Sequence, residues 1–128
     1  MKYLLDTHTY LWYRSSPRVL PSVILSLLTD MGQEMLISIV TPWELAIKTG
    51  IGKLNAAGLL VDFENRETAA GFVFAGITTT QAIRSGLLPL YHKDPFDRLL
   101  AAQALDLRIP LVSRDPVFDL YGVNRIWV

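Results

Sequence analysis

Short apolar segments alternate with helical patterns along this chain, and that alternation restricts its fold more than any other feature. Four segments have the length and composition of buried strands, namely residues 2–6 (KYLLD), 34–40 (EMLISIV), 109–113 (IPLVS) and 125–128 (RIWV). Because a helix between two strands returns the chain to the same end of a sheet, this order predicts parallel strands. We therefore predict an α/β fold with a mainly parallel sheet flanked by helices.

Capping and stop signals place the helical segments. The clearest helix runs from Asp94, which is followed directly by a proline, to about Leu107. Residues 54–75 are ambiguous and suit a helix that leads into a short strand near residues 73–77. Further helices are expected at residues 7–14, 22–32, 78–89 and from 41 to 50 or 52, with a short helical turn at residues 115–122.

The length of 128 residues suits a single domain, residues 1–128, that buries a core without disulfides. The chain has no cysteine, which excludes a disulfide framework and a thiolate zinc site. Its first apolar run meets Asp6 too early for a secretory signal, and no run approaches the ~18 apolar residues of a transmembrane helix. We expect a cytoplasmic protein without a membrane partner.

Acidic residues follow three of the predicted strands. Asp6 ends the first strand, Glu44 comes four residues after the second, and Asp115 comes two residues after the third. The carboxyl ends of parallel strands form the edge at which α/β sheets bind ligands, so these acids would share that edge. Asp97 opens the helix just upstream of the third strand and would look inward from the border of its buried side.

Each acid also has a purely structural explanation. The segment TPWE is a capping box, with Thr41 as N-cap and Glu44 at the third helical position. In DPFD, Asp94 is the N-cap and Asp97 lies near the positive end of the helix dipole. The other two acids precede helical starts in the same way, so capping alone would account for any one of them.

Capping does not explain why the acids would gather at one edge. Clustered carboxylates repel one another, which raises their pKa values. A divalent cation removes that penalty, and carboxylate oxygens suit magnesium or manganese. The pattern therefore predicts a metal site built from Asp6, Glu44, Asp97 and Asp115.

Composition points to a partner and leaves an anionic substrate open. A hydrophobic fraction of 51% and a mean hydropathy of +0.31 indicate apolar surface that a partner covers. The net charge is zero, from 12 basic and 12 acidic residues. If four acids surround cations, the remaining eight acids face 12 bases, so the neutral total does not exclude a nucleic acid.

Several other residues are weaker candidates. His8 and His92 lack a ligand spacing and are expected to be ordinary side chains. The tryptophans are expected in the core or an interface rather than as platforms for base stacking. Thr7 and Ser113 are next to predicted acids, where they could hydrogen-bond a carboxylate or a bound water, or cap a helix locally.

Four segments follow one another in a recognisable order: LLDTHTYLW, ISIVTPWELAIKTGIGKL, LPLYHKDPFDRLLAAQAL and IPLVSRDPVFDLYGVNRIW. In this order they resemble PIN-domain proteins of the VapC toxin type. The resemblance spans nearly the whole chain, and DPFDRLLAAQA is its most diagnostic part. It implies a three-layer α/β/α fold and a metal-dependent ribonuclease that acts as the toxin of a toxin–antitoxin pair.

The resemblance also implies roles for individual residues. Asp6 and Asp97 would bind magnesium or manganese directly, and Glu44 and Asp115 would complete the site directly, through water or around a second ion. The candidates for holding the RNA substrate are Thr7, Lys48, Arg98, Ser113 and Arg114. Lys48 and Arg98 could equally be solvated charges on a helix surface.

The expected protein partners are a cognate antitoxin and a second copy of the chain. The segment VLPSVILSLL, with Leu45 and Ile47, offers an apolar face for a homodimer or an antitoxin helix. Two other functions stay open on the residues alone. One is a magnesium-dependent phosphohydrolase of small molecules, and the other is a non-catalytic RNA-binding or receiver-like module. A receiver needs a lysine on its last strand, where RIWV offers only Arg125.

Overall fold

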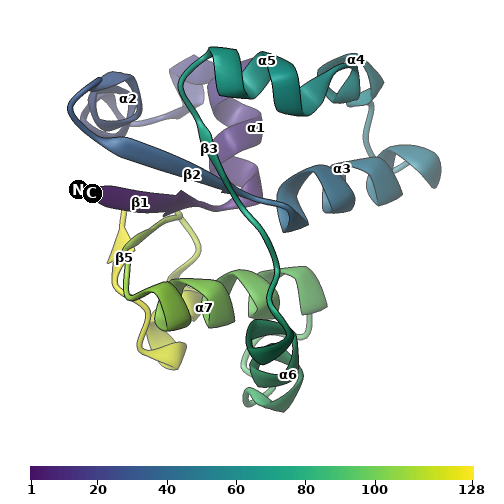
Figure 1. Cartoon of the computed structure of the whole chain (residues 1–128), viewed down its shortest axis with the longest axis vertical. Coiled ribbons are helices and arrows are strands. Elements are labelled where there is room, and N and C mark those ends of the chain that lie inside the picture. The colour runs from purple at the N-terminus through teal and green to yellow at the C-terminus, as the bar shows by residue number, and fades with distance from the viewer.

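A five-stranded sheet lies at the centre of the computed structural model, which describes residues 1–128 (Figure 1). Its order is β3-β2-β1-β4-β5, and every pair is parallel. The strands lie within the predicted ranges but are shorter; they are β1 (Lys2–Leu5), β2 (Glu34–Ser38), β3 (Val73–Ala75), β4 (Leu111–Val112) and β5 (Arg125–Ile126). The predicted parallel sheet is confirmed.

Helices cover both faces of the sheet, with α1, α4 and α5 on one side and α6 and α7 on the other (Figure 1). The predicted three-layer α/β/α architecture is therefore confirmed. None of the helices combines the length and apolar character needed to cross a membrane. Their bounds are α1 (Thr7–Ser15), α2 (Ser22–Thr29), α3 (Val40–Gly50), α4 (Ala57–Leu60), α5 (Phe63–Ala69), α6 (Thr79–Leu87) and α7 (Pro95–Leu107), with 3-10 turns η1 (Pro17–Val19) and η2 (Pro116–Tyr121).

The central strands build a separate core on each face. Successive side chains of a strand point to opposite faces. Leu4 packs in the core that contains Leu100 of α7, whereas Leu5 packs in the core that contains Tyr10 of α1. The residues paired with them on β2 and β4 alternate in the same way. Burial on both faces explains why these strands are continuous apolar runs.

The start of α3 differs from the prediction. The Oγ of Ser38, at the end of β2, accepts a hydrogen bond from the N–H of Val40 at 3.0 Å, and the helix begins there. Thr41 therefore lies inside the helix, where its Oγ1 is 3.1 Å from the buried Oγ1 of Thr7. The predicted capping box of Thr41 and Glu44 is wrong, and Glu44 has no capping role.

The start of α7 agrees with the prediction, while the segment before β3 does not. Asp94 Oδ1 accepts a hydrogen bond from the N–H of Phe96 at 2.9 Å, and Asp97 occupies the third helical position. Residues 54–75 contain two helices instead of one. Asp62 separates α4 from α5 because it adopts a left-handed φ of 50°.

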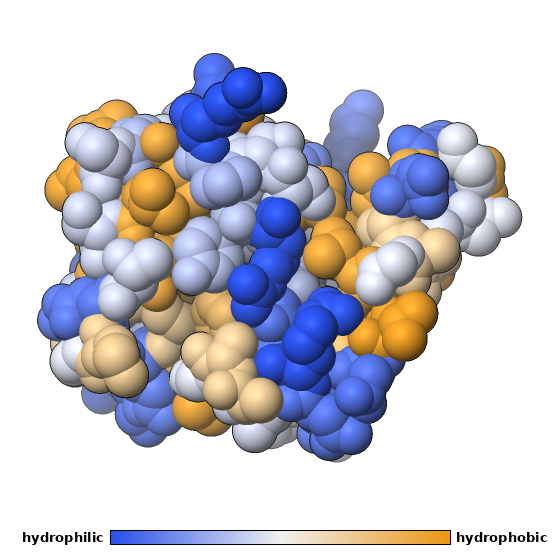
Figure 2. Space-filling view, turned by 90° about the horizontal axis from the view of Figure 1, so that it is seen from above, coloured by the Kyte–Doolittle hydropathy of each residue, from blue (hydrophilic) through white to orange (hydrophobic).

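The predicted apolar face is partly core. Leu45 and the inward residues of α2 are buried against α1, while Ile47 is exposed. On the side of the molecule seen from the top of Figure 1, hydrophobic residues form separate patches between hydrophilic ones (Figure 2). One exposed row along α3, which we call the α3 stripe, has a spacing of four residues and consists of Ile39, Trp43, Ile47 and Ile51.

A buried ion pair joins α5 to α1. Glu67 is fully buried and accepts hydrogen bonds from the Tyr10 hydroxyl and from the Arg14 guanidinium, whose Nε lies 2.9 Å away. Burial, together with the bond to Glu67, raises the pKa of Tyr10 to about 12. Because both Glu67 oxygens have donors, the charge is well satisfied in the core.

Glu67→Ala should lower the free energy of unfolding by roughly 3 kcal/mol, because it leaves Arg14 half-buried without its partner. Tyr10→Phe removes a single donor and should lower it by about 1 kcal/mol. Urea unfolding followed by circular dichroism measures both. A smaller effect for Glu67→Ala than for Tyr10→Phe would contradict this account of how α5 is held.

Candidate active site

The sheet brings the four predicted acids together at one edge. Asp6 directly follows β1, Glu44 lies on α3 after β2, and Asp115 follows β4 as the N-cap of η2. Asp97 lies in the first turn of α7. The strands on either side of β1 are β2 and β4, so the site lies where the sheet order reverses, as expected for α/β proteins.

Two of the acids each keep one buried oxygen without a partner. Asp6 is 3% exposed and Glu44 is 2% exposed. Asp6 Oδ2 accepts a hydrogen bond from Ser113 Oγ at 2.7 Å, and one Glu44 oxygen accepts from Lys48. Asp6 Oδ1 and Glu44 Oε1 have no donor, which is unfavourable for buried carboxylate oxygens. These two oxygens are therefore free to bind a cation.

The remaining acids add to this negative potential. Burial, followed by the charges of Asp6, Asp94 and Glu44, raises the pKa of Asp97 to about 8. The pKa of Asp6 is raised too, mainly by burial. Asp6 occupies the N-cap position of α1 without a side-chain capping hydrogen bond that meets the usual geometry. The protein alone leaves the cluster under-neutralised, which is the condition that a divalent cation relieves.

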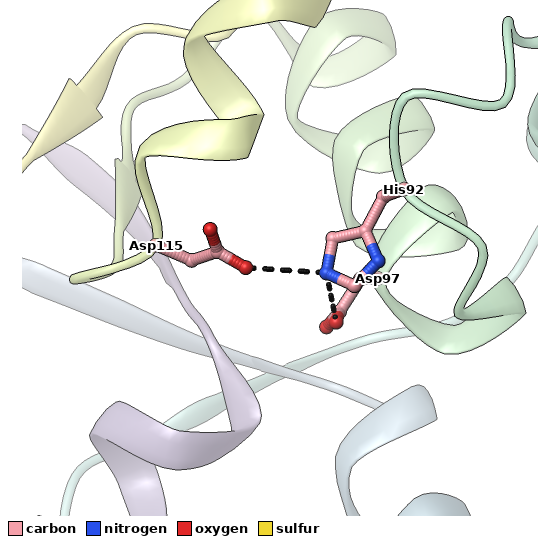
Figure 3. A group of neighbouring side chains, drawn as sticks. All are labelled: His92, Asp97 and Asp115. Atoms are coloured by element: carbon pink, nitrogen blue, oxygen red, sulfur yellow. Dashed lines mark hydrogen bonds and ion pairs between the residues drawn. The ribbon is translucent and has the colours of Figure 1, made fainter.

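His92 lies between Asp97 and Asp115 (Figure 3). Its Nε2 is 2.8 Å from Asp97 Oδ2 and 3.1 Å from Asp115 Oδ2. Its Nδ1 accepts a hydrogen bond from the N–H of Asp94 at 3.3 Å, so the ring hydrogen is assigned to Nε2, where both carboxylates face it. The donor atoms of His92, Asp97 and Asp115 all lie within 4.8 Å of one another.

Sequence reasoning missed His92 because it has no regular ligand spacing. The loop before α7 turns it inward, and Arg98 stabilises that loop. Arg98 Nη1 donates hydrogen bonds to the carbonyl oxygens of His92 and Lys93, at 3.0 and 3.2 Å. The available signal was the position of His92 directly before the DPFD segment, whose Asp97 faces the site.

The five predicted substrate-binding residues fall into two groups. Thr7 and Ser113 are buried and form hydrogen bonds inside the protein, and Arg98 bonds to loop carbonyls. These three residues hold neighbouring parts of the site in place through hydrogen bonds within the protein. Lys48 is partly exposed beside its Glu44 partner, and Arg114 is exposed. Of the basic candidates, Lys48 and Arg114 each line a hollow beside the acids, whereas Arg98 lines neither.

Two hollows flank the acids. One has a volume of about 490 Å³, and its lining includes Glu44, Lys48 and Lys53. The other has a volume of about 290 Å³ and is lined by Asp6, His8, Trp12, Arg114, Asp115 and Pro116. His8 lines both hollows. An extended chain could therefore pass from one hollow to the other across the acids.

Residues 3–124 match the PIN domain. This chain belongs to the PIN-domain family. A chain of VapBC2 from Rickettsia felis, bound to a promoter DNA fragment, is 16% identical with a TM-score of 0.71 and coverage of 100% of both chains. For VapBC-1 from nontypeable Haemophilus influenzae the identity is 18%, the TM-score 0.69 and the coverage 98% of this PIN domain and 97% of that chain.

A toxin–antitoxin complex from Klebsiella pneumoniae contains a further similar chain, 17% identical with a TM-score of 0.63 and coverage of 97% of this PIN domain and 93% of that chain. At such identities the likeness establishes the fold. No curated protein sequence matches this PIN domain.

The raised pKa of Asp97 predicts that the metal-free protein is less stable at high pH. Its pKa is about 8 in the folded state against an ordinary value of 3.8, so between these values the folded state binds more protons than the unfolded state. The free energy of unfolding therefore falls as the pH rises through this range. In EDTA near pH 8, Asp97→Asn should raise the free energy of unfolding by roughly 1–3 kcal/mol.

Urea unfolding at about pH 5 and about pH 8 measures this effect. Asp62→Asn is the matched control, because Asp62 is exposed between α4 and α5 and asparagine tolerates its left-handed backbone. Equal pH profiles for wild type and Asp97→Asn would contradict the prediction.

Proposed function

We propose that residues 1–128 form a single PIN-like domain that is a metal-dependent endoribonuclease, the toxin of a type II toxin–antitoxin pair. One observation carries the proposal: buried carboxylates from separate elements converge on one edge of the sheet, and Asp6 and Glu44 each keep a buried oxygen without a donor. Membership of the PIN-domain family and the shared fold with chains of VapBC complexes support it.

The donor set fits a divalent cation. Asp6 and Asp97 would bind it directly, and Glu44 and Asp115 would bind it directly or through water, while the Nε2–H of His92 faces the carboxylates of Asp97 and Asp115. Carboxylate oxygens suit magnesium or manganese. When bound, the cation supplies Lewis-acid stabilisation of the phosphoryl group and makes water more acidic.

The chain's own residues hold the acids in place and attract the RNA. Ser113 fixes Asp6 through one oxygen and Lys48 fixes Glu44 through one oxygen, which leaves the other oxygen of each acid without a donor. Such preorganisation lowers the cost of charge development during phosphodiester hydrolysis. Lys53 and Arg114 lie in opposite hollows, where they can bind phosphates on either side of the scissile bond.

We expect purified wild-type protein to cleave a mixed pool of labelled RNAs in manganese or magnesium, and EDTA to abolish cleavage. Asp97→Asn should reduce the cleavage rate by about 100-fold or more, because it removes a charged ligand from the site. The exposed Asp62→Asn control should cut like wild type. Gel electrophoresis of the products measures the rates, and circular dichroism checks that each variant is folded.

Cleavage that survives in EDTA, or in folded Asp97→Asn, would contradict a metal site at this edge of the sheet. Hydrolysis of a model phosphate ester without any cleavage of RNA would instead support a phosphohydrolase of small molecules.

Two protein partners belong to the proposal, a cognate antitoxin and a second copy of the chain. The α3 stripe supports pairing with a second copy, because its apolar residues are exposed in the single chain. Trp43 is 50% exposed and Ile51 is 62% exposed. Antiparallel pairing of two such helices would bury both stripes.

Ile47→Glu should convert a dimer into a monomer of 14.4 kDa, since a charge at the centre of the α3 stripe would be buried without a partner. Light scattering after size exclusion measures the mass. Ile83→Glu, an exposed isoleucine on α6, is the control that should leave the mass unchanged. A wild-type mass of 14.4 kDa at all concentrations would refute the dimer.

A further inference from the structure

Trp12 is a half-buried residue of α1 that lies beside the acids. It forms part of the wall of the hollow of about 290 Å³ that also contains Asp6 and Asp115. His8, one helical turn earlier on α1, places its ring 5.8 Å from the Trp12 ring. The hollow therefore has an aromatic wall on α1 and an acidic wall at the ends of β1 and β4.

Other residues of the protein pack against Trp12. Its ring centroid is 6.1 Å from that of Trp127, which follows β5, and Trp12 also packs against the core beneath α1. These contacts fix the orientation of the indole. A rigid aromatic ring that is held from behind and faces a hollow is a platform on which a flat ring can stack.

The lining of the hollow indicates what kind of group enters it. Its two carboxylates, from Asp6 and Asp115, belong to the proposed cation site, while its aromatic wall suits a nucleobase, which is flat and uncharged. Arg114 is exposed, so it can pair with a phosphate of the same strand outside.

We propose that this hollow is a nucleobase subsite, in which the base next to the scissile phosphate stacks on Trp12 while Arg114 binds a flanking phosphate. The inference rests on the proposed ribonuclease function and adds how the RNA strand is positioned. Stacking accepts every base because each has a π-face, so the subsite would require an unpaired nucleotide at the cleavage position rather than a particular sequence. Trp12 would be a substrate-binding residue, separate from the metal ligands.

The first test measures binding without cleavage. A fluorescein-labelled single-stranded RNA of mixed sequence is titrated in EDTA with wild type, Trp12→Ala and Trp12→Phe, and anisotropy gives the Kd values. Trp12→Ala should weaken binding by about tenfold or more, and Trp12→Phe, which keeps a ring, by less than about threefold. Tyr13→Ala is the matched control, because Tyr13 is also half-buried on α1 but packs against Phe72, and it should bind like wild type.

The second test detects stacking directly. The chain has three tryptophans, so the double variant Trp43→Phe, Trp127→Phe leaves Trp12 as its only indole. Addition of the RNA should quench the emission of this variant, since a stacked base quenches an indole. The expected change in kcat/KM with manganese for Trp12→Ala is a loss similar to the loss in binding.

The outcomes separate the subsite from the proposed function. If wild type cleaves RNA but folded Trp12→Ala binds and cleaves equally well, the subsite is refuted and the ribonuclease proposal stands. Unchanged emission from Trp12 on RNA binding also refutes the subsite. If wild type neither binds nor cleaves any RNA, both proposals fail.

Discussion

Mutual repulsion of buried carboxylates is the constraint around which the active edge of this PIN domain is built. Burial and the neighbouring acids together raise the pKa of Asp97 to about 8, so the cluster costs stability when its charges are not neutralised. Other parts of the fold must supply that stability. The double core on the two faces of the sheet and the buried Glu67–Arg14 pair are such parts. Stability and binding potential thus come from different side chains of one small domain.

Local sequence signals predicted the type and order of the elements, and through that order the pairing of the strands. The alternation of strands and helices gave the parallel sheet, and the proline after Asp94 gave the correct start of α7. Apolar runs buried on both faces marked the central strands. The type of each element follows from patterns within a few residues, and the alternation of strands with helices then predicts parallel pairing.

Individual side-chain hydrogen bonds between distant segments were missed. The segment TPWE has the residue pattern of a capping box. In the structure, however, the Ser38 hydroxyl at the end of β2 accepts a hydrogen bond from the N–H of Val40, and the helix begins there. Thr41 forms a hydrogen bond with Thr7 instead. His92 faces Asp115 only because the loop before α7 folds back, and no spacing in the chain encodes that turn. Convergence of the acids was predictable from topology, whereas the two donor-free oxygens required the tertiary hydrogen bonds to be known.

The bond from Ser113 to Asp6 joins residues 107 positions apart in the chain. Asp115, which follows Ser113, completes the acidic edge from the same late segment. The edge can therefore form only after residue 115 has been synthesised, and a chain that stops before Ser113 lacks both residues. Such long-range pairing makes the acidic edge one of the last parts of residues 1–128 to form during synthesis.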